Sequence, residues 1–431
     1  MIATHLVSAL RRFRSPQGSV SVLVAAALVP LIGMLGAGLD YSRAMVSRGR
    51  LDAALDAAVL AAAQAAKAAD AQNQSKDQIE AAAKKAGEAA FVANDAVAGN
   101  VAVEISPALT NRTVTITGTY TADVKTTVTQ LIGYPSVPIS GRSTASAELS
   151  PYIDIYLLID VSASMALGAT TADIAKLTSA FGCAFACHDD VKVKGTQYDS
   201  FQWAQKNGIR LRMNEINDGI ADFVATLQKQ GAAKQRLRIA VYSFSTTLTK
   251  LVGLTSTLSA ATGNLPTAPD LSHEGGDPKV IDYAGATHFG KIMPDFAKEV
   301  GAGGDGQTAA KKLVIIATDG VQDPTRSWTN YVELRPQVTP FSPADCQKLD
   351  ASVSVGVLYA PYLQMPWDWG YVATLGQPSQ IGNRGTRFDD IVPQLKACAS
   401  PGMFVDLGTT SSVASGFKSL FDTFAQVRLT R

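Results

Sequence analysis

The sequence has little excess of either charge and few cysteines. Among its 431 residues, 38 lysines and arginines stand against 37 acidic residues, which gives a net charge of +1. A surface that binds nucleic acid needs a basic excess, so this balance argues against nucleic acid as a partner. Four cysteines are too few for a disulfide-rich scaffold. Because 46% of the residues are hydrophobic and only 17% are charged, a mostly disordered chain is also excluded. The length predicts two or three domains.

The first 39 residues predict a membrane anchor. Residues 1–18 contain three arginines and no acidic residue, and residues 19–39 contain no charged residue. At about 1.5 Å per residue, residues 19–39 form a helix about 31 Å long, which matches the hydrocarbon core of a bilayer. Positive charge before the span predicts a cytoplasmic N-terminus and an exported C-terminal part. A cleaved signal peptide is the alternative, with Gly36-Ala37-Gly38 as the candidate cleavage site, although its apolar region is normally shorter.

Residues 40–150 predict a long helix followed by a small β-sheet. The stretch 42–93 is rich in alanine and places Leu51, Leu55 and Val59 on one face, as in an amphipathic helix. This face packs either on its own domain or on partner helices, and the sequence leaves both readings open. Alternating β-branched and polar residues then predict strands at 101–105, 113–121 and 139–149.

From residue 151 onward the pattern predicts an α/β domain. Nearly continuous apolar runs, typical of central parallel strands, alternate with helical stretches. We therefore expect a doubly wound parallel sheet, in which ligands bind at the carboxyl ends of the strands. The expected strands are 152–160, 236–245, 312–318, 352–360 and 403–408. The expected helices are about 209–230, 288–300, 389–397 and 412–426.

Oxygen-bearing side chains follow two of these strands. Asp160, Ser162 and Ser164 form an Asp-x-Ser-x-Ser loop after the first strand, and Asp319 lies in a Thr-Asp-Gly turn after a later one. Thr287 precedes an expected helix between them. Mg²⁺ prefers oxygen ligands in octahedral geometry, and these side chains supply most of such a set. The alternative is that they are ordinary turn and helix-capping residues.

With these motifs, residues 151–431 resemble a von Willebrand factor A domain with a metal-ion-dependent adhesion site. The resemblance implies that Mg²⁺ or Mn²⁺ is held by Asp160, Ser162, Ser164, Thr287 and Asp319. Thr287 follows Gly-Ala instead of the commoner Gly-Gly, which leaves Thr308 as a rival.

The chemistry of this site favours binding over catalysis. Neutral hydroxyl ligands leave the cation electron-poor, so it attracts a carboxylate from a partner. Hydrolysis would require a base or nucleophile beside the metal, and the four histidines lie in no recognisable catalytic motif. His288, next to Thr287, is expected either to begin a helix or to contact the metal ligands without binding the metal itself. The sequence therefore predicts a protein that is not an enzyme.

The cysteines fall in two groups. Residues 166–207 look like an insertion at the rim of the site, because the first convincing helix begins only near residue 208, and they contain Cys183 and Cys187 followed by a histidine. A local disulfide between these two is the leading interpretation, with Cys346 and Cys398 as the second pair. Cys-x-x-x-Cys-His is one residue longer than a haem-attachment signature, so haem and zinc remain alternatives. Four cysteines allow three pairings, and the sequence does not choose among them.

The segments Gly18-Ser-Val-Ser-Val-Leu-Val-Ala-Ala-Ala, Gly38-Leu-Asp-Tyr-Ser-Arg43 and Leu51 to Ala63, followed by an A domain, resemble the TadG-like proteins of the Flp/Tad pilus-assembly system. The resemblance implies a single-pass protein of the bacterial inner membrane, whose C-terminal domain is periplasmic or directed to the surface. Its implied partners are other pilus-assembly proteins or an acidic protein ligand.

One position departs from pilin-like precursors, which carry a glutamate five residues after the cleavage-site glycine. Here Leu23 is the fifth residue after Gly18, so we expect neither prepilin processing nor a role as a major pilus subunit. Two other functions stay open. One is a membrane-anchored adhesin or scaffold unrelated to pili, and the other is an exported metal-dependent hydrolase.

Overall fold

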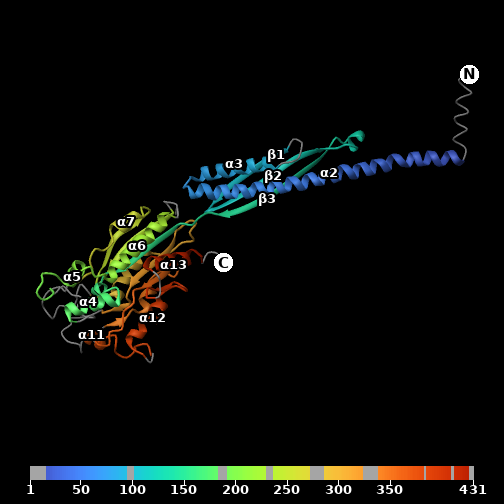
Figure 1. The fold of residues 1–431 in the computed structure, drawn as a ribbon. Helices are drawn as coiled ribbons and strands as arrows, with labels where there is room; N and C mark the ends of the chain where they lie inside the picture. The colour runs from blue at the N-terminus through green and yellow to red at the C-terminus, as the bar shows by residue number, and fades with distance from the viewer. Residues whose placement is uncertain are drawn as a thin grey trace, which may run out of the picture. The chain divides into compact units, whose positions relative to one another are not determined.

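The computed structural model consists of two compact units, residues 1–150 and residues 151–431 (Figure 1). The residues that the structure describes are 16–94, 101–182, 192–229, 236–271, 286–323, 338–382, 385–408 and 412–426. Most of the basic N-terminal stub therefore lies outside the described residues, as do Cys183 and Cys187.

One continuous helix, α2 (Pro16–Ala71), contains both the predicted span and the first part of the Ala-rich segment. It is the one helix in the described part of the chain that is long and apolar enough to cross a membrane. Pro30 lies inside the helix, a position that membrane helices tolerate. The prediction of a single helix over 42–93 is wrong in one respect, because the helix ends at Ala71 and a second helix begins at Lys76. Asn73, with a φ of 58°, lies in a turn that leads into α3 (Lys76–Asn94).

The helices α2 and α3 cover a three-stranded antiparallel sheet (Figure 1). Its strands, in spatial order, are β1 (Val101–Thr110), β2 (Thr113–Lys125) and β3 (Ser136–Glu148). The seam of Leu51, Leu55 and Val59 is buried. A Cβ on Gly118 of β2 would lie 2.8 Å from Leu55 Cδ1, so the helix sits directly on the sheet. The apolar seam therefore packs on its own domain, which decides between the two readings of the sequence.

The second unit is built on a six-stranded sheet with the order β11-β10-β7-β4-β5-β6. Five strands are parallel, which confirms the predicted α/β fold class. The sixth strand, β6, was not among the predicted strands; it lies at one edge of the sheet and pairs antiparallel with β5. The bounds are β4 Ile153–Asp160, β5 Leu237–Phe244, β6 Leu248–Thr255, β7 Lys311–Thr318, β10 Ser354–Tyr359 and β11 Phe404–Asp406.

Helices cover both faces of this sheet, and β4 supplies side chains to both cores. Tyr156 and Leu158 face one core, and Ile155 and Leu157 face the other. The first core is closed mainly by α8 (Phe289–Val300) and α12 (Arg387–Cys398). The second is closed by α6 (Arg212–Lys229) and α13 (Val413–Gln426). This alternation explains why the strand is apolar throughout.

Short elements complete the unit. The segment 166–207 was expected to precede the first helix, but within its described part it contains α4 and α5. The remaining bounds in this unit are η2 Ala163–Ala166, α4 Thr171–Phe181, α5 Ser200–Lys206, α7 Ser259–Gly263, β8 Val321–Gln322, β9 Thr339–Pro340, α10 Pro343–Cys346 and α11 Trp369–Ala373, while η1 Thr129–Ile132 lies between β2 and β3 in the first unit. A disulfide joins Cys346, at the end of α10, to Cys398, at the end of α12, with a Cα–Cα distance of 5.4 Å.

Candidate metal centre

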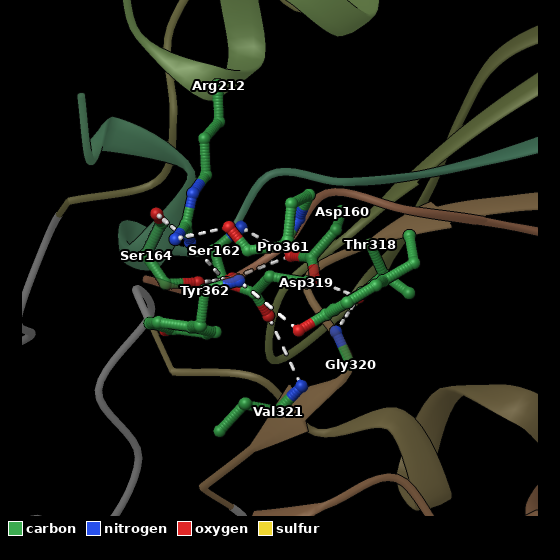
Figure 2. Close-up of polar contacts among 11 residues, drawn as sticks. Asp160, Ser162, Ser164, Arg212, Thr318, Asp319, Gly320, Val321, Pro361 and Tyr362 are labelled. Carbon is green, nitrogen blue, oxygen red and sulfur yellow. Dashed lines mark hydrogen bonds and ion pairs between the residues drawn. The ribbon is translucent and has the colours of Figure 1, made fainter. Parts of the chain in front are cut away.

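The candidate site lies at the carboxyl ends of β4 and β7, which are neighbours in the sheet. Asp160 is the last residue of β4, and Asp319 directly follows the last residue of β7. Both carboxylates are fully buried. Parallel pairing thus brings two acidic side chains, 159 residues apart in sequence, to the same edge of the sheet (Figure 2).

The Asp-x-Ser-x-Ser loop is organised around the carboxylate of Asp160. Its Oδ1 accepts hydrogen bonds from the backbone N of Ser162 at 2.9 Å and from the Ser162 hydroxyl at 2.6 Å. The hydroxyls of Ser162 and Ser164 lie 3.1 Å apart. The three side chains predicted from the loop therefore converge on one point (Figure 2).

The Thr-Asp-Gly turn adds a second group of contacts. Thr318 donates its hydroxyl hydrogen to Asp160 Oδ2 at 2.7 Å, which links the two strand ends directly. Asp319 Oδ1 accepts from the backbone N of Val321 at 3.2 Å. Gly320 has a φ of 76°, and a Cβ there would lie 2.6 Å from Leu395 Cδ1. Glycine is therefore required at this position, both for the backbone conformation and for the close approach.

A buried arginine enters the site from the start of α6. The Nη1 of Arg212 donates to Asp319 Oδ2 at 3.2 Å and to the backbone carbonyl of Ser164 at 3.4 Å. Its Nη2 donates to the carbonyl of Pro361 at 3.1 Å, and its guanidinium lies 4.3 Å from the ring centroid of Tyr362. Only 5% of the Arg212 side chain is exposed. The guanidinium is therefore an internal counter-ion of the site (Figure 2).

Thr287 reaches the same group of loops through Asp323. The backbone N of Thr287 donates to Asp323 Oδ1, and the backbone N of Asp323 donates to the Thr287 carbonyl at 3.1 Å. The rival Thr308 lies in the loop before β7 and therefore at the amino-terminal ends of the strands, away from the candidate site. Its backbone N donates to Asp305 Oδ1. His288 is the N-cap residue of α8, in agreement with its expected place at a helix start.

Negative charge exceeds positive charge at this edge of the sheet. Burial, followed by the repulsion from Asp319, raises the pKa of Asp160 to about 7. Burial also raises the pKa of Asp319, although Arg212 opposes that shift. The pKa of Asp323 rises to about 7, again mainly through burial. Among the described residues, Arg212 is the cation paired with Asp319, and no ion pair is found there for Asp160 or Asp323, so further positive charge or protons must balance these carboxylates.

The donor set suits a hard divalent cation. Two buried carboxylates and two serine hydroxyls converge, and oxygen ligands of this kind are those that Mg²⁺ and Mn²⁺ prefer. The excess negative charge of the buried carboxylates also favours a bound cation. The assignment of Asp160, Ser162, Ser164, Thr287 and Asp319 as ligands remains a prediction.

Several residues of the site were not foreseen from the sequence. Asp323 stands four residues after Asp319 in Thr-Asp-Gly-Val-Gln-Asp, and its acidic side chain was the available signal. Arg212 belongs to an ordinary Arg-Leu-Arg at a helix start, so its sequence gives no sign that it turns inward. Tyr362 follows β10 in a loop without a recognisable motif.

Solved structures similar to the chain include bacterial proteins of low sequence identity. BatB from Bacteroides thetaiotaomicron is 15% identical, with a TM-score of 0.32, over 64% of this chain and 98% of that chain. An aerotolerance-related membrane protein from Bacteroides fragilis is 13% identical, with a TM-score of 0.32, over 64% and 99% of the two chains. The vWF domain of the type V pili tip protein Mfa5 from Porphyromonas gingivalis is 16% identical, with a TM-score of 0.22, over 40% and 39%.

Among curated proteins, no sequence matches the chain. A family model does match its N-terminal region. This model, described as putative Flp pilus-assembly TadE/G-like, aligns with residues 18–65, which include the apolar span and the start of the Ala-rich segment. The resemblance noted in the sequence is confirmed for this region. Over residues 18–65, which are 48 of its 431 residues, the chain is therefore similar to TadE/G-like Flp pilus-assembly sequences.

Proposed function

We propose that this chain is a membrane-anchored, non-enzymatic protein of Flp/Tad pilus assembly or adhesion. In this proposal α2 anchors the chain in the bacterial inner membrane, and the second unit is exported as an A domain. The domain holds Mg²⁺ or Mn²⁺ and binds a carboxylate of a protein partner through that ion. The family match to residues 18–65 supports the pilus role, because it covers the membrane-spanning candidate itself.

The observation that carries the binding role is the meeting of Asp160 and Asp319 at adjacent strand ends. These residues, with Ser162 and Ser164, would hold the cation, and Thr287 would join them from its neighbouring loop. When bound, the ion would supply a Lewis-acidic position for a carboxylate of the partner. The chain's own residues orient the ligands, because Thr318 fixes Asp160 and the backbone N of Val321 fixes Asp319.

The contacts of the site support binding more than hydrolysis. The Thr318 and Ser162 hydroxyls both donate to Asp160, so each is engaged in positioning that carboxylate. The backbone N of His288 donates to the Ser245 carbonyl, and the residue starts a helix. Hydrolysis nevertheless remains the alternative that an experiment must test.

The test is calorimetric titration of the full chain in nanodiscs with Mg²⁺ and Mn²⁺, with and without Asp160→Ala. We expect the variant to lose metal binding while its thermal unfolding stays cooperative. Asp218→Ala is the control, because Asp218 is 65% exposed on α6 and its ion pair is with Arg210, which is itself 54% exposed. Normal metal binding by Asp160→Ala would show that the site assignment is wrong.

The pilus role needs a separate experiment in the source bacterium. Surface pili are counted in a sheared fraction after deletion of the gene and after complementation with the intact gene or with Asp160→Ala. Loss of pili that only the intact gene restores would support metal-dependent assembly. Normal pilus numbers after deletion would instead favour an adhesin or scaffold unrelated to pili. A metal-dependent hydrolytic activity that disappears in Asp160→Ala would favour the enzyme.

A further inference from the structure

The turn between β2 and β3 exposes an unusual amount of apolar surface. Its 3-10 helix η1 and the residues after it carry Leu131, Ile132 and Tyr134, which are 82%, 66% and 67% exposed. The stretch 126–138 contains no charged residue. Three large exposed apolar side chains in an uncharged turn are typical of a contact surface.

The same turn packs against the apolar part of α2. Val128 lies against Gly36, where an added Cβ would come within 2.1 Å of Val128 Cγ1. Gly36 belongs to the uncharged stretch 19–39 and precedes Asp40 by four residues. At about 1.5 Å per residue, this contact lies about 6 Å before Asp40, the first charged residue after the apolar stretch. The tip of the hairpin is therefore level with the border of the membrane span.

Asp40 ties the turn to this level of the helix. Its carboxylate accepts hydrogen bonds from the backbone N of Thr127, Val128 and Thr129 at 2.8–2.9 Å, and from the Thr129 hydroxyl at 3.0 Å. Arg43, one turn further along α2, donates to the Thr127 hydroxyl at 2.8 Å. These bonds satisfy backbone groups that a less polar environment would otherwise leave unpaired.

We propose that the β2–β3 turn is a second membrane contact, in which Leu131, Ile132 and Tyr134 enter the interface of the bilayer that α2 crosses. The occupant of this surface is lipid, because the turn is continuous with the apolar surface of the span and lacks charge. A depth of about 6 Å agrees with the 5–10 Å over which interfacial segments are buried. Tyrosine beside the border fits the preference of aromatic side chains for that region. This contact rests on the proposed anchoring by α2 and goes beyond the proposed pilus and metal-binding roles.

The test places the photocrosslinker p-benzoylphenylalanine in the full chain, reconstituted in nanodiscs of phosphatidylethanolamine and phosphatidylglycerol. It replaces Leu131 in one variant, Leu28 of the span in a second, and Val92 of α3, which is 70% exposed, in a third. After irradiation, adducts are identified by mass spectrometry. We expect phospholipid adducts at positions 131 and 28 but not at 92. A lipid adduct at 28 without one at 131, or an adduct from 131 to a second copy of the chain, would overturn the proposal.

A pair of glycine variants tests the positioning of the turn. Gly36→Leu forces Val128 away from the helix, whereas Gly33→Leu meets nothing within 4 Å in the structure. We expect the lipid-adduct yield at position 131 to fall several-fold in Gly36→Leu and to stay unchanged in Gly33→Leu. The adduct at position 28 should persist in both, which shows that the chain is still inserted. An unchanged yield at 131 in Gly36→Leu would contradict the packing on which the proposal depends.

Discussion

Replacement of Arg212 by methionine should make the stability of the second unit depend on divalent metal. Methionine keeps most of the length and apolar surface of the side chain but removes the charge that faces Asp319. The two groups are 5% and 0% exposed, and their closest atoms lie 3.2 Å apart. Without the guanidinium, the buried carboxylates keep no positive partner of the chain among the contacts described above. A bound divalent cation would replace that lost charge.

The size of the effect follows from the burial of the pair. At an effective dielectric constant of about 20, two unit charges 3.2 Å apart attract each other by roughly 5 kcal/mol. Removing one partner of a buried ion pair costs about 3–5 kcal/mol, because the other charge remains buried and unpaired. In domains of this size, about 1 kcal/mol shifts the melting temperature by roughly 2–4 °C. We therefore expect metal-free Arg212→Met to unfold about 10 °C below the metal-free parent.

The measurement is thermal unfolding of the full chain in EDTA and in millimolar Mg²⁺. Mg²⁺ should raise the melting temperature of Arg212→Met more than that of the parent, because binding to the folded state stabilises it. Arg210→Met is the matched control. Arg210 lies two residues before Arg212 and pairs with Asp218. Both members of this pair are more than half exposed, so the loss of Arg210 should cost no more than about 1 kcal/mol. The reasoning is refuted if Arg212→Met melts with the parent in EDTA, or if Mg²⁺ stabilises the two equally.

Three further predictions concern other parts of the chain. The double variant Cys346→Ser, Cys398→Ser removes a cross-link that closes a loop of 52 residues, so chain entropy predicts that the free energy of unfolding falls by about 4 kcal/mol. Denaturant unfolding measures this change, and an unchanged midpoint would contradict the prediction. In EDTA, burial raises the pKa of Asp160 from 3.8 to about 7. Between these two pH values the folded state therefore binds more protons than the unfolded state. Stability should therefore fall as the pH rises from about 4 to 7, and equal melting temperatures at pH 5 and 8 would argue against this. Gly118→Leu should disrupt the packing of Leu55 on the sheet, and hydrogen exchange of the β2 amides should increase; unchanged protection would contradict that contact.

Local patterns predicted those parts of the fold in which burial dictates residue type. The apolar run before Asp160 identifies β4 because both faces of that strand are covered, and the same holds for β7 before Asp319. The strand β6 was missed because it lies at an edge and mixes threonine, lysine and glycine with its apolar residues. The interruption after Ala71 was missed because Asn73 is a single residue in a region otherwise favourable to helix.

The candidate site was only partly predictable for a related reason. Candidate ligands that are grouped in a short loop, such as Ser162 and Ser164, are visible as a motif. A long-range partner such as Arg212 is not, because its role depends on where the start of α6 meets the loop after β7. The same limit applies to the β2–β3 turn. The absence of charge in the turn can be read from the sequence. The position of the turn beside Gly36, however, is known only from the packing of the hairpin on α2.

The continuity of α2 has a mechanical consequence. From Asp40 to Ala71 the helix runs on beyond the predicted span for about 48 Å without a proline, and its inner face is fastened to the sheet by Leu51, Leu55 and Val59. A force applied to the first unit would therefore be transmitted to the bilayer through a continuous helix and not through a flexible linker. Tilting the helix would carry the whole sheet with it, so a pull on this unit would be felt in the membrane as a torque.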